Sequence, residues 1–118
     1  MAVAQGAGAL SQVQAGQWQV HVVGDKSPPR AICAADVKRL LQIEHGGATC
    51  TFRTISDAGS AATVRYVCPG AGNGMTELTV ESRTIVRLHT QGVAKGAPYD
   101  VTYEARYAGA CGAGLAQR

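Results

Sequence analysis

Four cysteines in a chain of 118 residues constrain this sequence more than any other feature. The material for a core is otherwise thin, because aromatic residues make up only 5% of the chain and glycine occupies 15 positions. Small domains with little core are the ones that gain most from disulfide bonds. The even number of cysteines therefore predicts two disulfides in one domain, formed by Cys33, Cys50, Cys68 and Cys111.

Zinc is the competing use of four cysteines. Structural zinc sites usually draw on closely spaced C-x₂₋₄-C pairs, whereas these cysteines lie far apart in the sequence. The histidines His21, His45 and His89 are equally dispersed. We therefore expect no metal site and no cofactor. Four cysteines permit three pairings, and their spacing does not choose among them.

Disulfides persist in oxidising compartments, which predicts a periplasmic or secreted protein. Residues 1–16 have neither the basic start nor the apolar stretch of a signal peptide, so we expect that a leader has been removed. No run approaches the roughly 18 apolar residues of a membrane span, and the scattered arginines form no basic block for nucleic acid. We interpret residues 1–16 as a flexible N-terminal tail, 17–112 as a single β-rich domain and 113–118 as a C-terminal tail.

Hydrophobic alternation with a period of two predicts strands along most of the domain. Trp18 should be the inward-facing anchor of the first strand, and similar patterns occur at 49–56, 61–67, 76–80, 86–90 and 99–107. One helical pattern covers 34–42, where Val37, Leu40 and Leu41 share a face. The expected fold is mainly β (α+β). It is an antiparallel meander of about six strands, in a curved sheet or partial barrel, with one short helix.

Two hairpin registers follow if the apolar side chains are to share one face of the sheet. Phe52 should lie opposite Tyr66, because a slip of one residue would bury Arg53. Glu77 should lie opposite His89 on the other face of a second hairpin.

Groups suited to catalysis are sparse in this chain. Glu77, Glu81 and His89 would share one strand face, but such a row is more often the solvated side of a sheet than a hydrolase site. The glycine-rich stretch 69–74 lacks the following helix that a phosphate-binding loop needs, so it is interpreted as a hairpin loop. Oxidised cysteines leave no thiolate. We therefore expect a protein that is not an enzyme.

The aromatic residues are the most interesting candidates for a binding site. Trp18 and the row Tyr99, Tyr103 and Tyr107 would line a cavity if the sheet curls enough to enclose one. A small hydrophobic ligand would bind on that concave face, whereas in a flatter sheet the same rings would form a filled core.

A second class of function is a structural or interaction protein of the cell envelope. An open sheet has exposed edges, and the arginines Arg83, Arg87 and Arg106 would supply a basic surface for another envelope protein. The same edges would also permit a homodimer.

Several motifs occur in an order that is similar to a known family. They are Gly16-x-Trp18, Cys33 at the start of the expected helix, a hairpin bracketed by Cys50 and Cys68-Pro69-Gly70, and Gly109-Ala110-Cys111. This order resembles the bacterial family called domain of unknown function 3617, which consists of small exported proteins, and the likeness spans residues 16–112. The chain departs from the pattern at Gln19, where the family commonly has an acid, and at Ala110, where it commonly has Asp.

The resemblance implies an envelope location in a bacterium and the pairing of Cys33 with Cys50 and of Cys68 with Cys111. It implies no activity. The hairpin register instead places Cys50 opposite Cys68, and a bond between directly paired neighbours is often strained. We therefore retain the pairing that the resemblance implies.

Overall fold

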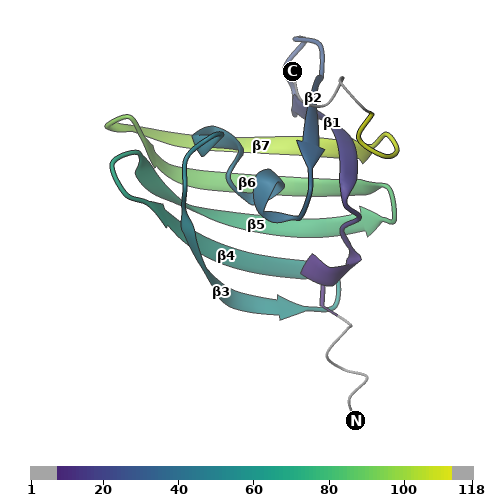
Figure 1. The fold of residues 1–118 in the computed structure, drawn as a ribbon, viewed down its shortest axis with the longest axis horizontal. Helices are drawn as coiled ribbons and strands as arrows, with labels where there is room; N and C mark the ends of the chain where they lie inside the picture. The colour runs from purple at the N-terminus through teal and green to yellow at the C-terminus, as the bar shows by residue number, and fades with distance from the viewer. Residues whose placement is uncertain (1–7, 113–118) are drawn as a thin grey trace.

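A computed structural model describes residues 8–112, which form an antiparallel sheet of seven strands (Figure 1). The strands are β1 (Gly16–Val22), β2 (Arg30–Ala34), β3 (Thr51–Ala58), β4 (Ala61–Cys68), β5 (Gly72–Ser82), β6 (Ile85–Ala94) and β7 (Ala97–Tyr107). Their order is β2-β1-β7-β6-β5-β4-β3, so β3 to β7 form a continuous meander and β1 joins it beside β7. The mainly β antiparallel fold is confirmed, as an open sheet with one strand more than expected.

The additional strand, β2, takes over the start of the expected helix. It pairs with β1 and includes Cys33 and Ala34, so the prediction of a helix over 34–42 was too long. The α-helix α1 is limited to Lys38–Leu41. Its N-cap residue is Val37, and just before it the Asp36 carboxylate accepts a hydrogen bond from the Lys38 backbone N–H at 2.8 Å.

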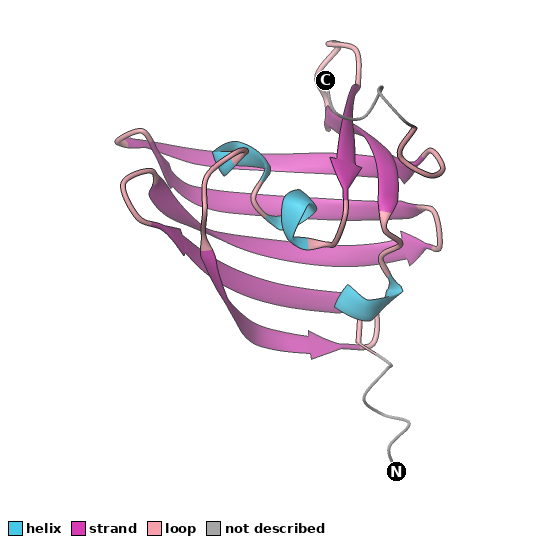
Figure 2. Ribbon diagram, viewed as in Figure 1, coloured by secondary structure: helices cyan, strands magenta, loops and turns pink. Residues whose placement is uncertain are grey.

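Two 3₁₀ turns accompany α1 among the described residues (Figure 2). They are η2 (Leu10–Gln12) and η3 (Ile43–His45). Both α1 and the turns are too short to persist alone and depend on packing against the sheet.

The core lies between the sheet and these helical segments, on the face of the sheet that we call the inner face. Trp18 is fully buried there, as predicted, and its indole N–H donates to the Gln14 carbonyl at 3.0 Å. Leu40 and Leu41 of α1 are buried over the same face. The other large side chains with almost no exposure are those of Tyr66, Leu78, Leu88, Val20, Val64 and Val86.

Both predicted hairpin registers are confirmed. Phe52 pairs with Tyr66 between β3 and β4, and Glu77 pairs with His89 between β5 and β6. The first hairpin also contains a β-bulge that the sequence did not predict. The register shifts between Thr54 and Ser56, which leaves a two-residue turn between the paired residues 58 and 61.

The glycine-rich stretch does not form the long loop expected over 69–74, because β5 already begins at Gly72. Gly74 pairs with Tyr66 on one side and with Gly92 on the other. A Cβ atom at Gly74 would lie 2.2 Å from the Tyr99 hydroxyl and 2.6 Å from the Tyr66 ring. Glycine at this position leaves room for two tyrosine rings to pack against the strand. In the sequence, a glycine needed for such close packing cannot be distinguished from one that forms a loop.

The disulfides are Cys33–Cys111 and Cys50–Cys68. Two disulfides were predicted correctly, but the retained pairing of Cys33 with Cys50 and of Cys68 with Cys111 was wrong. The β3–β4 register brings the Cα atoms of Cys50 and Cys68 to within 4.1 Å of each other. Cys33 lies in β2, at the opposite edge of the sheet from β3. Strand pairing therefore determines the connectivity.

Part of the expected N-terminal tail packs on the domain. Ala9 is fully buried, and the Leu10 backbone N–H donates to the Asp57 carboxylate at 3.3 Å. The Gln12 side chain donates to the Gly59 carbonyl at 2.9 Å. Burial of Ala9 and these two hydrogen bonds hold the segment on the domain, although the sequence shows no periodic pattern there. The remainder of that expected tail, residues 1–7, and the C-terminal tail at 113–118 lie outside the described residues.

Candidate functional site

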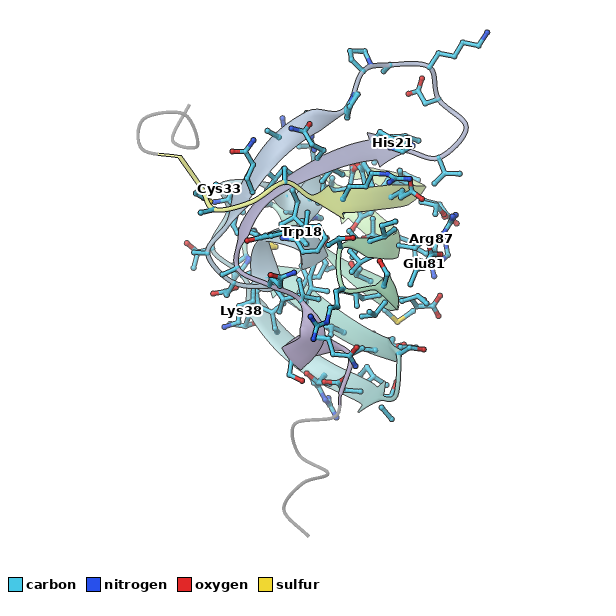
Figure 3. All side chains as sticks on the ribbon, turned by 90° about the vertical axis from the view of Figure 1, so that its right-hand side faces the viewer. Trp18, His21, Cys33, Lys38, Glu81 and Arg87 are labelled. Carbon is cyan, nitrogen blue, oxygen red and sulfur yellow. A yellow bond between two sulfur atoms is a disulfide. The ribbon has the colours of Figure 1, made fainter. Side chains whose placement is uncertain are left out.

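The four aromatic residues predicted to line a cavity all face the core side of the sheet. Trp18 lies inside the molecule (Figure 3), and its ring meets that of Tyr107 edge-on at 5.4 Å between centroids. The hydroxyl of Tyr99 is hydrogen-bonded to the hydroxyl of Tyr66, with 2.9 Å between the two oxygen atoms. Beneath these three rings the inner face is therefore filled by side chains. Tyr103 has a different environment.

A chain of hydrogen bonds runs through this filled region. The Nε2 atom of His45 lies 2.9 Å from the Val93 carbonyl, and its Nδ1 atom lies 2.9 Å from the Tyr66 hydroxyl. A carbonyl only accepts, so the Nε2–H group of His45 donates to Val93. In the tautomer that carries its single proton on Nε2, Nδ1 accepts from Tyr66, and Tyr66 then accepts from Tyr99. Burial raises the pKa of Tyr66, and the hydrogen bond with Tyr99 adds to this effect. The raised pKa keeps the Tyr66 phenol protonated, so that it can act as a hydrogen-bond donor within a structural network.

Sequence reasoning did not identify His45 as part of this network. It is only 5% exposed and is the last residue of the 3₁₀ turn η3. No local pattern distinguishes it from the other histidines, and its hydrogen-bond partners, Tyr66 and Val93, come from two separate strands.

A pocket of about 400 Å³ opens beside Tyr103. It lies among β1, the loop at 23–29, the start of β2 and η3. Val20, Val22, Pro28, Ile43 and Tyr103 form its apolar wall, and His21, Asp25, Ser27, Arg30 and Glu44 supply polar groups. We call it the Tyr103 pocket. Of the four predicted rings, Tyr103 is the one that lines it.

Tyr103 and Glu44 form the polar centre of the Tyr103 pocket. The phenol of Tyr103 donates a hydrogen bond to the Glu44 carboxylate. Burial raises the pKa of Tyr103, the hydrogen bond to Glu44 raises it further, and nearby Arg30 opposes the shift. The pocket therefore presents a neutral phenol, a carboxylate and a guanidinium beside an apolar wall.

The Tyr103 pocket also contains a serine, a histidine and an aspartate, but they are not arranged as a catalytic triad. Ser27 donates from its hydroxyl to Asp25 at 3.2 Å and from its backbone N–H to the same oxygen at 3.1 Å. Activation of a serine requires its hydroxyl to donate to a histidine. Among the described residues no hydrogen bond connects His21 to either side chain, so the Ser27–Asp25 contact is a turn within the loop.

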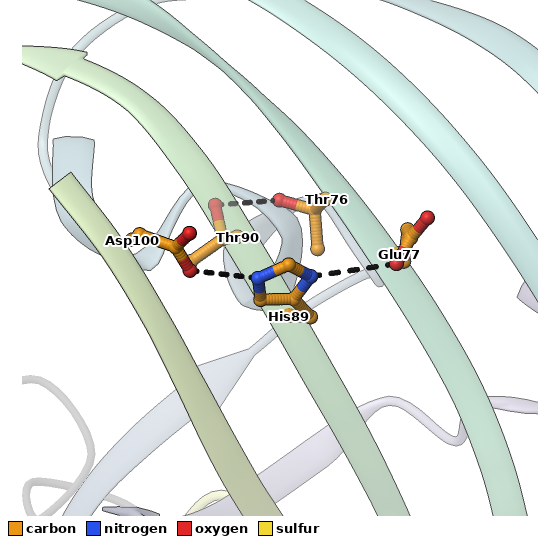
Figure 4. Close-up of polar contacts among 5 residues, drawn as sticks. All are labelled: Thr76, Glu77, His89, Thr90 and Asp100. Carbon is orange, nitrogen blue, oxygen red and sulfur yellow. Dashed lines mark hydrogen bonds and ion pairs between the residues drawn. The ribbon is translucent and has the colours of Figure 1, made fainter. Parts of the chain in front are cut away.

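Polar side chains on the opposite side of the sheet, the outer face, form a separate network (Figure 4). His89 lies between Glu77, with 3.4 Å from Nδ1 to the carboxylate, and Asp100, with 2.7 Å from Nε2. The hydrogen bond to Asp100 is the main reason that the pKa of His89 is raised. Their sequence neighbours Thr76 and Thr90 point to the inner face, as expected for alternating strand residues.

Other charged groups on the outer face also form ion pairs. Arg87 lies 3.1 Å from Glu81 and 4.0 Å from Glu104, and Arg106 lies 3.5 Å from Glu104. Figure 3 shows Glu81 and Arg87 side by side. Two of the three arginines proposed as a basic surface are therefore partnered by carboxylates.

Within residues 8–112, no cluster of three or more histidine, cysteine, aspartate or glutamate side chains is arranged to hold a metal ion. All four cysteines are in disulfides. None of the helices in this part of the chain has the length and apolar character needed to cross a membrane.

Comparison with known proteins gives one result. The model of a family described as "Protein of unknown function (DUF3617)" matches residues 13–111. No curated protein and no solved structure matches the chain.

Proposed function

The chain belongs to the DUF3617 family, whose description assigns no activity, and from this premise we propose that it is a non-catalytic binding module for a small amphipathic ligand. The ligand occupies the Tyr103 pocket. The observation that carries this proposal is a pocket of about 400 Å³ with an apolar wall and a few converging polar groups. That combination is typical of small-molecule sites.

The chemistry of the Tyr103 pocket favours binding over reaction. The Tyr103 phenol is already hydrogen-bonded to the Glu44 carboxylate, and the Ser27 hydroxyl donates to Asp25 rather than to a histidine. The polar groups therefore fix the orientation of a ligand, and Val20, Val22 and Ile43 contact its apolar part. Of the predicted ligand-binding residues, Tyr103 contacts the ligand directly, while Trp18, Tyr99 and Tyr107 support the sheet around it.

The proposal includes a location. Two disulfides indicate an oxidising compartment outside the cytoplasm. A location in the periplasm of a bacterium, or secretion from it, fits both this compartment and the family resemblance.

The test is binding of N-phenyl-1-naphthylamine, a neutral dye that fluoresces in apolar sites. Val22 and Val23 are neighbours, but only Val22 lines the Tyr103 pocket, so Val22→Phe fills the pocket and Val23→Phe is its matched control. Ser27→Trp fills the pocket from the exposed loop and replaces Val22→Phe if that variant fails to fold. We expect saturable binding in the wild type and in Val23→Phe, and its loss in the filled variants. Equal binding by wild type and filled variants would contradict the proposal.

An interaction protein that acts through a sheet edge is the second candidate. Strand β3 supports it, because all its residues except Phe52 are exposed. The bulge between Thr54 and Ser56 opposes it, since bulges twist an edge away from partners. Capture of a specific envelope protein that is lost in Ile55→Lys would favour this candidate over the first.

A further inference from the structure

Two arginines on the outer face, in β3 and β4, have no ion-pair partner within residues 8–112, unlike the charged side chains of β5, β6 and β7. The charged residues of those three strands all take part in ion pairs: Glu77, Glu81, Arg87, His89, Asp100, Glu104 and Arg106. Arg53 of β3 and Arg65 of β4 are exposed, lie directly opposite each other in the ladder, and have no carboxylate partner among the described residues.

Two like charges opposite each other in a sheet repel. The arrangement becomes favourable when an anion lies between the two guanidinium groups, because each group can donate two parallel hydrogen bonds to a carboxylate or phosphate. The pair therefore destabilises the free protein slightly and is suited to a bound anion.

A groove begins beside this pair. It has a volume of about 220 Å³ and is lined on one side by Arg65, Met75 and Gln91 and on the other by Val67 and Asn73. These side chains come from neighbouring pairs, since Arg65 lies opposite Met75 and Met75 opposite Gln91. The groove thus crosses strands β4 to β6 on the outer face.

Exposed valines continue the apolar side of the groove. Val67 is 48% exposed and Val93 is 36% exposed, and both lie opposite Asn73 in the sheet. Val67 lies two residues after Arg65 in β4 and therefore on the same face of the sheet. The valines thus provide an apolar surface next to the anion site that the two arginines form.

We propose that this groove binds an anionic amphiphile, with its carboxylate or phosphate between Arg53 and Arg65 and its apolar part along Val67, Met75 and Val93. The site is separate from the Tyr103 pocket, whose lining residues come from β1, the loop at 23–29, β2, η3 and β7. The groove would bind a second ligand, of negative charge, and this proposal does not depend on a ligand in the Tyr103 pocket.

The test is a titration of the full ¹⁵N-labelled protein with octyl phosphate, followed through the amide chemical shifts. We expect the largest shifts at 65–67, 73–75 and 91–93. Arg53→Gln and Arg65→Gln should each raise the dissociation constant about tenfold, the size expected for loss of a charged hydrogen bond. Arg87→Gln removes an arginine of the same face that is already ion-paired, and it should bind as the wild type does.

Two further ligands make the test specific. Octyltrimethylammonium carries the same chain with the opposite charge and should not shift these amides, and inorganic phosphate should bind more weakly than octyl phosphate. The proposal is overturned if the cationic amphiphile binds equally, if phosphate alone binds as well, or if the shifts appear only around Tyr103. Both glutamine variants should keep or raise the unfolding temperature, which separates lost binding from lost folding.

Discussion

Cys33 and Cys111 are bonded to each other across the end of β1, with 5.7 Å between their Cα atoms. Gln17 of β1 pairs with Cys33 on one side, and on the other its backbone N–H donates to the Gly109 carbonyl at 2.8 Å. The disulfide therefore joins the edge strand β2 to the segment that follows β7. It holds the edge strand β2 and with it Arg30, which lines the Tyr103 pocket.

The two disulfides should differ in how much they stabilise the fold. Cys33–Cys111 closes a separation of 78 residues and Cys50–Cys68 a separation of 18. The chain-entropy relation assigns about 4.5 kcal/mol to the longer loop and about 3 kcal/mol to the shorter. Urea unfolding of the double alanine variants should show the larger loss for C33A/C111A. The opposite order, or peptide mapping that finds another pairing, would contradict the structure.

His89 should make stability depend weakly on pH. Its pKa is raised in the folded state, mainly by Asp100, so its contribution is complete below the unfolded pKa of about 6.5 and is lost as pH rises through the folded value. Because the side chain is 36% exposed, we expect His89→Gln to lose less than about 1 kcal/mol at pH 5.5 and almost nothing at pH 9. NMR titration that finds an unshifted or lowered pKa for His89 would refute this interpretation.

Gly74 should not tolerate a methyl group. The added Cβ of Gly74→Ala would clash with the Tyr99 hydroxyl and the Tyr66 ring, and overpacking of this kind destabilises proteins by roughly 1–3 kcal/mol. Gly46→Ala is the control, since its nearest atom in the structure is 3.7 Å away and its backbone conformation is ordinary. Adding Tyr99→Phe to Gly74→Ala should restore part of the loss in thermal unfolding. Equal stability of the two alanine variants would contradict the packing described here.

Thr76 should anchor α1 to the sheet. Its hydroxyl donates to the Leu41 carbonyl at 2.7 Å and lies 2.9 Å from the Thr90 hydroxyl. Thr76→Val keeps the shape but removes the donor, so we expect a loss of about 1–2 kcal/mol in the free energy of unfolding. Thr79→Val lies on the exposed face of the same strand and should change stability little. A similar effect of both variants would show that the hydrogen bond is not the anchor.

Local alternation accounts for the parts of the fold that the sequence predicted. Phe52 opposite Tyr66 and Glu77 opposite His89 follow once apolar side chains must share a face, because a one-residue slip reverses the whole strand. Trp18 was recognised as buried for the same reason. Such arguments need only a strand and its hairpin neighbour.

The features that the sequence did not predict depend on contacts between distant segments. Strand β2 is five residues long and has little alternation, so only its pairing with β1 identifies it. Gly74 resembles a loop residue until the rings over it are known. The Tyr103 pocket requires β1, η3 and β7 together, which is why one of its residues was predicted and Arg30 and Glu44 were not.

The most direct test of the central proposal is native mass spectrometry of the protein after export through a bacterial periplasm, without reducing agent. The account predicts a mass four hydrogens below that of the thiol form, consistent with two disulfides. It also predicts a bound small molecule in the wild type and in Val23→Phe that is absent from Val22→Phe and Ser27→Trp. An oxidised protein with no bound species, or one that the filled variants retain equally, would contradict a ligand in the Tyr103 pocket.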